Sequence, residues 1–178
     1  LVVSHGDGDH AGGYHGLVDA IAVEQGVYGA DFSPSIPLGP KQIKCRSGQR
    51  WTWQHQSQGF LLFKPVTDTV WLSILSPTAD NQSVGNNSSC VMLIEWRDQR
   101  ILLPGDIEAT AEALVIAELS KPVTVLLGPH HGSKTSSTVE FVNTVRPQHV
   151  VFSAGYRHHF GHPHGQVVVR YSEAGSRL

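Results

Sequence analysis

The sequence predicts a single α/β domain. Short apolar runs of strand type alternate with segments of helical pattern along the chain. The length of 178 residues suits one hydrophobic core, and 40% hydrophobic with 16% charged residues is typical of a packed globular chain. No apolar run approaches the roughly 18 residues that a membrane span requires. We therefore expect residues 1–178 to form one domain.

The first third of the chain predicts a strand, a loop and a helix, followed by an irregular insertion. Residues 1–4 have the pattern of a short buried strand, and residues 11–23 carry apolar side chains along one side of a helix. Residues 27–58 are rich in Gly, Pro and Ser, and Trp51 and Trp53 alternate there as in a half-buried strand. This stretch predicts loops with short strands.

The remaining elements follow from apolar runs and helix-favouring stretches. Strands are predicted at 60–63, 70–75, 90–96, 100–103, 123–127 and 150–152. Helices are predicted at 107–119, at 138–145 before Pro147, and from Pro163 onwards. The turn at 97–99 makes a hairpin of the two strands beside it. Polar residues collect at strand ends, where sites in layered α/β proteins form.

Charge and histidine content narrow the function. The formal net charge of -2 and the pI of about 6.6 exclude a whole-molecule positive field that would attract nucleic acid or an acidic membrane surface. Any anionic substrate must therefore be held by local charge. Of the 11 His, seven lie between His130 and His164. Hydrophobic burial does not require this unevenness, which is the first indication of a functional site.

The stretch His5-Gly6-Asp7-Gly8-Asp9-His10 places four side chains that can bind metal within six residues. Its glycines let the backbone turn tightly, so that all four side chains can face one pocket. The alternative is an acidic turn in which Asp9 begins a helix while His5 and His10 lie at the surface. The pattern favours a metal site because Gly12-Gly13 follows it, which makes the motif specific.

This motif resembles the hallmark HxHxDH of the metallo-β-lactamase fold superfamily, with Asp7 in the place of the second His. Together with four further segments, it is similar to the C-terminal domain of the ComEC family of competence DNA-uptake proteins. These segments are Asn86-Asn87-Ser88-Ser89, Pro104-Gly105-Asp106, His130-His131-Gly132-Ser133 and Gly161-His162-Pro163-His164. The resemblance covers essentially the whole chain. It implies a four-layer αββα sandwich, trimmed at both ends here as a fragment of a larger membrane protein.

The resemblance also implies a two-metal site. It makes His5 and Asp7 ligands of one metal, Asp9, His10 and His162 ligands of the second, and Asp106 the bridging carboxylate. The superfamily usually places another His before the Asp106 strand, where this chain has Asn86 and Asn87. His130 or His131 then completes the first site or donates a proton to the leaving group; alternatively, both are loop residues bonded to backbone. The candidate catalytic residues are therefore Asp9, Asp106, His130 and His131.

The ligand types indicate which metal and which substrate groups to expect. Carboxylate and amide oxygens in place of imidazole favour Mn²⁺ or Mg²⁺, so we expect two divalent ions, Mn²⁺ first and Zn²⁺ second. Two ions roughly 3.5–4 Å apart would activate the attacking hydroxide and stabilise both oxygens of a phosphodiester displacement. The candidate residues for binding substrate phosphate are Asn87, Ser133, Lys134 and Arg157. Each of these, taken singly, is also explained as a solvated surface residue.

The resemblance implies a nuclease that degrades the DNA strand that is not imported during natural transformation. The parent protein would lie in the cell membrane, with this domain on the periplasmic or extracellular side. Its partners would be DNA, a membrane channel and an oligonucleotide-binding-like domain of the same chain, and other competence proteins. Two alternatives stay open. The same ligands would serve a hydrolase of another small phosphodiester or a lactone, and a chain that kept the motif without turnover would be a DNA-binding or assembly module.

Two further expectations concern the cysteines and the motif loop. Cys45 and Cys90 are too few and too far apart for a zinc ribbon or a CxxC redox pair, which leaves one disulfide or two buried thiols. The ComEC resemblance places them outside the reducing cytoplasm, so they should pair. The resemblance also implies strands ahead of residue 1. Without them we expect a mobile loop at 5–10 and weak metal binding.

Overall fold

The computed structural model describes residues 1–56, 67–78, 84–156 and 160–178. The strand expected at 60–63 and the candidate phosphate ligand Arg157 lie outside these residues. None of the helices in the described part of the chain has the length and apolarity needed to cross a bilayer.

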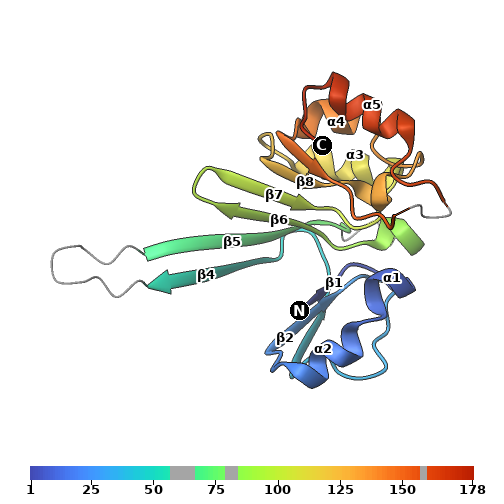
Figure 1. The fold of residues 1–178 in the computed structure, drawn as a ribbon. Coiled ribbons are helices and arrows are strands. Elements are labelled where there is room, and N and C mark those ends of the chain that lie inside the picture. Colours follow the sequence, from blue (N-terminus) through green and yellow to red (C-terminus); the bar gives the residue numbers. More distant parts are fainter. Residues whose placement is uncertain (57–66, 79–83, 157–159) are drawn as a thin grey trace.

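Two β-sheets form the centre of the molecule (Figure 1). The smaller is parallel and has the order β1-β2-β3, formed by β1 (Val2–Val3), β2 (Gln25–Tyr28) and β3 (Lys41–Lys44). The larger has the order β4-β5-β6-β7-β8-β9, formed by β4 (Arg50–Gln56), β5 (Thr67–Ser76), β6 (Val91–Trp96), β7 (Gln99–Leu103), β8 (Val125–Leu127) and β9 (His149–Val151). Strands β4 to β7 pair antiparallel, whereas β7, β8 and β9 pair parallel.

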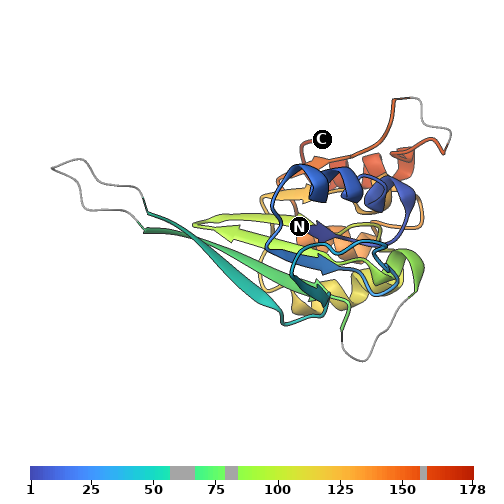
Figure 2. The same ribbon diagram turned by 90° about the horizontal axis from the view of Figure 1, so that it is seen from below.

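Helices cover the outer faces of the two sheets (Figures 1 and 2). Helices α3 (Ala109–Glu118), α4 (Val139–Val145) and α5 (Gly165–Glu173) lie on the larger sheet, and α1 (Gly8–Ala11) and α2 (Tyr14–Ala20) lie on the smaller one. Two short 3₁₀ helices, η1 (Gly85–Ser88) and η2 (Pro129–Gly132), follow β5 and β8 along the chain. Figure 2 shows that the β4–β5 pair extends well beyond the rest of the molecule.

Three apolar clusters hold these elements together. The largest, between the larger sheet and α3 to α5, contains Leu102, Val115 and Phe141, all fully buried. A second lies between the two sheets, and a third beneath α1 and α2 contains Val3 and Leu38. Burial of each such side chain stabilises the fold by about 1.5–3 kcal/mol. The sequence therefore forms a mixed α/β structure in which both sheets bury side chains on their two faces.

The structure corrects the prediction of one helix over 11–23. The helical segment begins earlier, at Gly8, and divides into α1 and α2 at Gly12-Gly13 before ending at Ala20. A Cβ atom on Gly12 would lie 2.4 Å from the Gly8 carbonyl oxygen, so a residue with a side chain does not fit at this position. The stretch predicted as loops with short strands also contains β3 and β4, and β2 begins two residues before it. The other strand and helix predictions that fall on described residues match elements of the structure.

The two cysteines form a disulfide, as expected. Cys45 follows β3 and Cys90 precedes β6, and their Cα atoms are 5.6 Å apart. Both side chains lie in the cluster between the sheets. The bond therefore links the end of β3 in the smaller sheet to the start of β6 in the larger sheet.

Candidate metal centre

His5 occupies the end of β1. The backbone of β1 is held by Gly29, whose N–H donates to the Val3 carbonyl oxygen at 3.0 Å, and by Cys90, whose N–H donates to the Ser4 carbonyl oxygen at 2.8 Å. These bonds turn the side chain of His5 inward, where it is fully buried. The rest of the motif forms the start of α1, with Asp7 at its N-cap and Asp9 and His10 in its single turn.

Asp106 follows β7 through a turn that depends on Gly105. Gly105 has a φ of +61°, and a Cβ atom there would lie 2.8 Å from the Cβ atom of Ser89. The backbone N–H of Asp106 donates to the Ser89 hydroxyl oxygen at 3.1 Å. The turn therefore places the Asp106 side chain, which is only 7% exposed, next to the buried end of β1.

His130 and His131 follow β8 in an unusual backbone conformation. Their φ angles are +47° and +54°, in the left-handed region that residues other than glycine rarely adopt. Each such residue costs roughly 1–3 kcal/mol, and the conformation persists only where the surrounding structure holds it. Here the His130 N–H donates to the Gly105 carbonyl oxygen at 3.1 Å, which ties the histidine loop to the Asp106 turn.

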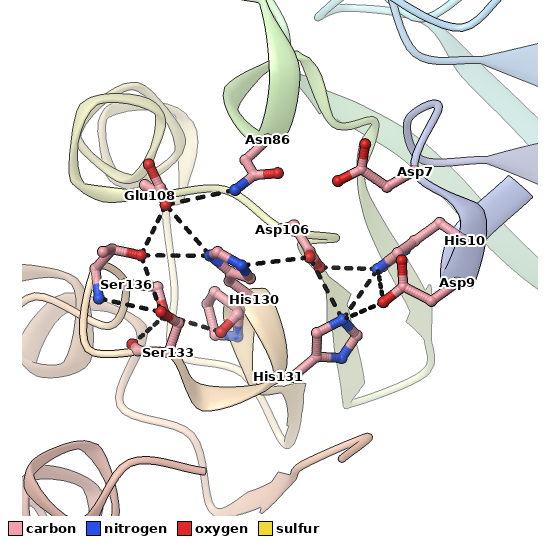
Figure 3. A network of polar contacts seen from close by, with 12 residues as sticks. Asp7, Asp9, His10, Asn86, Asp106, Glu108, His130, His131, Ser133 and Ser136 are labelled. Atoms are coloured by element: carbon pink, nitrogen blue, oxygen red, sulfur yellow. Dashed lines mark hydrogen bonds and ion pairs between the residues drawn. The ribbon is translucent and has the colours of Figure 1, made fainter. Parts of the chain in front are cut away.

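Four imidazoles surround the carboxylate of Asp106, and Figure 3 shows three of them, His10, His130 and His131. The distances from Nε2 to the nearest Asp106 oxygen are 3.1 Å for His10, 3.4 Å for His131, 3.9 Å for His130 and 4.0 Å for His5. Two outer carboxylates complete the cluster. Asp7 lies 3.5 Å from Nε2 of His5, and Asp9 lies 3.1 Å from Nε2 of His131.

The donor atoms form two overlapping groups. His5, His10 and Asp106 make one group, and Asp9, His10 and His131 make the other; within each, the donor atoms lie within 4.8 Å of one another. This is the spacing at which side chains from separate strand ends can share an ion. The expected convergence of the motif with Asp106 is therefore observed.

Hydrogen bonds on the far side of the rings decide where the histidine protons lie. Nδ1 of His131 is 2.7 Å from the Ser153 carbonyl oxygen, which can only accept, so this nitrogen carries the proton. Nδ1 of His5 lies 3.4 Å from the Ser89 hydroxyl, which donates to the Asn86 carbonyl oxygen, and 3.1 Å from the Ser4 hydroxyl, which can either donate or accept. The contact of Nδ1 with Ser153 leaves Nε2 of His131 facing the carboxylates of Asp9 and Asp106.

Nε2 of His5 supplies the test of whether these residues suit a metal ion. It is a buried atom with no hydrogen-bond donor beside it in the described structure, and its neighbours are the carboxylate oxygens of Asp7 and Asp106. A buried lone pair facing carboxylates is unfavourable without a cation or a proton. Imidazole nitrogens with carboxylate oxygens are the ligands of divalent transition metals. The residues present therefore fit a divalent ion.

The electrostatics of the cluster keep Asp106 ionised. Burial raises its pKa, but the hydrogen bond from His10 and the charges of His10, His131 and His5 outweigh burial and hold the pKa below its ordinary value. Burial likewise lowers the pKa of His10, yet the hydrogen bond to Asp106 and the nearby carboxylates raise it overall. The pKa of His5 is lowered, by burial first and then by His10.

Comparison with known proteins relates the sequence to a group of bacterial proteins. It is 31% identical over 96% of its length to "Recombination protein 2" of Haemophilus influenzae, 29% over 100% to "Competence protein ComA" of Neisseria gonorrhoeae, and 30% over 94% to "ComE operon protein 3" of Bacillus subtilis. The sequence is therefore similar to segments of bacterial proteins named for competence and recombination. It spans about a fifth of the length of these curated relatives. No family model matches the sequence.

His131 lies beside Asp9 and His10, where the family resemblance places His162. His162 instead lines an adjoining cavity of about 250 Å³ with Asp9 and His131. Its ring centroid is 5.9 Å from that of His130. The structure therefore places His162 at the border of the cluster, and within the described residues it belongs to neither group of converging donor atoms.

The candidate phosphate ligands have different surroundings. The Asn87 side-chain oxygen accepts the N–H of Glu108 at 2.9 Å, so it holds the Asp106 turn. Ser133 is buried and its hydroxyl accepts the N–H of Thr135 at 3.4 Å. Lys134 is exposed and lines a cavity of about 370 Å³ beside His130. Lys134 is therefore the candidate that the structure leaves facing open space next to the cluster.

Several residues that orient the histidines were not predicted from the sequence. The Ser4 hydroxyl lies between Nδ1 of His5 at 3.1 Å and Nδ1 of His10 at 3.0 Å. Glu108 contacts Nδ1 of His130 at 3.3 Å. Their only signal was position: Ser4 directly precedes the motif, and Glu108 follows Asp106 by two residues.

Proposed function

We propose that this chain is the metal-dependent nuclease domain of a ComEC-type competence protein and hydrolyses DNA phosphodiesters. Its relatives are named for competence and recombination, which supports DNA as the substrate class. The observation that carries the proposal is the convergence of four Nε2 atoms on the buried carboxylate of Asp106. The helices outside two packed sheets also agree with a metallo-β-lactamase-like four-layer sandwich.

The chain's own residues have distinct tasks in this proposal. His5, His130 and Asp106, with Asp7 beside His5, would hold one ion, and Asp9, His10 and His131 would hold the other, because the single lone pair on Nε2 of His10 can bind only one ion. Bound ions, Mn²⁺ before Zn²⁺, would polarise the phosphodiester and lower the pKa of the attacking water. Asp106 stays ionised because its pKa is lowered, so its carboxylate oxygens can serve as anionic ligands between the two sets of side chains. Lys134 would pair with a neighbouring phosphate of the strand.

The location and partners follow from the same proposal. The Cys45–Cys90 disulfide supports a site outside the reducing cytoplasm, on the periplasmic or extracellular side of the cell membrane. There the domain would degrade the strand that is not imported, alongside a membrane channel and an oligonucleotide-binding-like domain of its parent chain and other competence proteins.

The test is metal loading followed by DNA cleavage. The chain with Mn²⁺ should nick supercoiled plasmid and digest single strands, and Asp106→Asn should lower the rate by at least about 100-fold because it removes the shared anionic ligand. Glu140→Gln, at an exposed position on α4, is the matched control and should cleave normally. If the wild-type chain binds no divalent metal, or if Asp106→Asn cleaves at the wild-type rate, the proposal fails.

A small-molecule hydrolase is the second candidate, because a cavity beside the cluster is partly lined by apolar side chains. The lining of this cavity of about 370 Å³ includes the polar residues Asp9, His10, Asp106 and His131 and the apolar residues Met92, Leu103 and Leu127. A pocket of this kind suits a compact phosphodiester or lactone. Turnover of bis(p-nitrophenyl) phosphate or a lactone without cleavage of DNA would favour this candidate, and DNA binding without turnover of any substrate would favour an assembly module.

A further inference from the structure

Glu108 lies on the side of His130 that faces away from Asp106 (Figure 3). Three groups surround one of its oxygens, Oε1. Nδ1 of His130 is 3.3 Å away, the Thr135 hydroxyl donates to it at 2.7 Å, and the Asn86 amide donates to it at 3.4 Å. The carboxylate is therefore the centre of a small polar network next to the candidate metal centre.

The chemistry of this network determines which nitrogen of His130 carries the proton. An ionised carboxylate can only accept, so Nδ1 of His130 must donate to it. The Thr135 hydroxyl, 3.3 Å from the same nitrogen, has already given its proton to Glu108 and can also only accept. Nδ1 is thus protonated, and Nε2 presents a lone pair towards Asp106 at 3.9 Å.

Glu108 is itself held in place by the chain. Its N–H donates to the Asn87 side-chain oxygen at 2.9 Å, and its carbonyl oxygen accepts the N–H of Glu112 at 3.0 Å, where α3 begins. The side chains of His130 and Glu108 are only 22% and 30% exposed. A partly buried carboxylate with several donors is a stronger constraint than a solvated surface ion pair.

We propose that Glu108 is a positioning residue that fixes the tautomer and orientation of His130, so that Nε2 faces the metal centre. The part concerning metal rests on the proposed function, whereas the tautomer is a property of the metal-free chain. Carboxylates that orient a metal-facing histidine in this way commonly affect metal affinity by about 10- to 100-fold when they are removed. Glu108 would therefore act on the metal without touching it.

Nitrogen NMR of ¹⁵N-histidine-labelled protein tests the tautomer directly. In the metal-free wild-type chain, His130 should be protonated at Nδ1. In Glu108→Ala it should shift towards the Nε2-protonated form, and Glu108→Gln should largely restore the wild-type form because its side-chain oxygen can still accept. An Nε2-protonated His130 in the wild-type chain would overturn the inference whether or not the chain binds metal.

Calorimetric titration with Mn²⁺ tests the consequence. Glu108→Ala should bind about 10- to 100-fold more weakly than wild type, with Glu108→Gln in between. Glu140→Ala removes an exposed carboxylate from α4 and should bind as wild type does. Equal Mn²⁺ affinity of Glu108→Ala and wild type refutes a positioning role. Absence of Mn²⁺ binding by the wild-type chain refutes the proposed function instead, and the tautomer measurement then decides on Glu108 alone.

Discussion

Asp106 shows how one residue depends on its surroundings for its chemistry. Burial by itself would favour the neutral acid, but His10 donates to it at 3.1 Å and His131 and His5 add positive potential. The result is an ionised carboxylate at a site that is almost inaccessible to water. Its neighbours are four imidazoles, and the hydrogen bond from His10 together with their charges favours the ionised form of the carboxyl.

The pair of Asp106 and His10 predicts a pH window of stability in the metal-free protein. Asp106 has a lowered pKa, so its contribution is complete above 3.8 and is lost as pH falls through the folded-state value. His10 has a raised pKa, so its contribution is complete below 6.5 and is lost as pH rises through the folded-state value.

Asp106→Asn should therefore destabilise the chelator-treated protein more at about pH 5.5 than at about pH 9. Urea unfolding at the two pH values measures this difference. A loss of unfolding free energy that is the same at both values would show that the two side chains do not interact in solution.

At the scale of elements, strand ends and tight turns bring the donor atoms together. β1, β7 and β8 end near one another, and their following residues are His5, the Gly105 turn and the His130 loop. Apolar runs such as 90–96 and 123–127 could be predicted as strands because hydrophobic pattern is local. The close approach of Gly12 to the Gly8 carbonyl could not be predicted, because it is visible only in the folded backbone.

Gly105→Ala tests the role of the turn. The substitution combines a positive φ with a contact to Ser89, so we expect it to cost about 2–4 kcal/mol of unfolding free energy and to weaken Mn²⁺ binding. Gly175→Ala is the matched control, because Gly175 also has a positive φ but its Cβ would meet no atom within 4 Å. Similar losses for the two variants in chemical denaturation would mean that the contact with Ser89 contributes nothing.

At the scale of the whole molecule, the disulfide links the two sheets close to the site. Cys90 follows Ser89, which contacts both His5 and Asp106, so the cross-link adjoins the residues that orient the cluster. The bond closes a loop of 45 residues, for which the loop-entropy model gives a stabilisation of about 4 kcal/mol.

The double substitution Cys45→Ser with Cys90→Ser should lower the free energy of unfolding by about this amount, roughly 4 kcal/mol. Guanidinium titration of the variant against the oxidised wild type measures the loss. Thiol titration of the denatured, unreduced wild-type protein should find no free thiol. Two thiol equivalents per chain would contradict the disulfide itself.

The sequence alone determined the local half of the candidate site. His5, Asp7, Asp9 and His10 stand within six residues, so their proximity needs only a strand end and a tight turn. The pairing of Cys45 with Cys90 was likewise implied by family resemblance. The tertiary structure decided which distant groups join them. His131 lies 121 positions from His10 and contacts it at 3.2 Å, whereas His162 lies beside His130. The placement of His131 rather than His162 beside His10 depends on how the left-handed turn after β8 packs against Gly105. The contact of Glu108 with His130 depends on the same packing. Contacts between separate strand ends are fixed by tertiary packing, which leaves no periodic signal in the sequence.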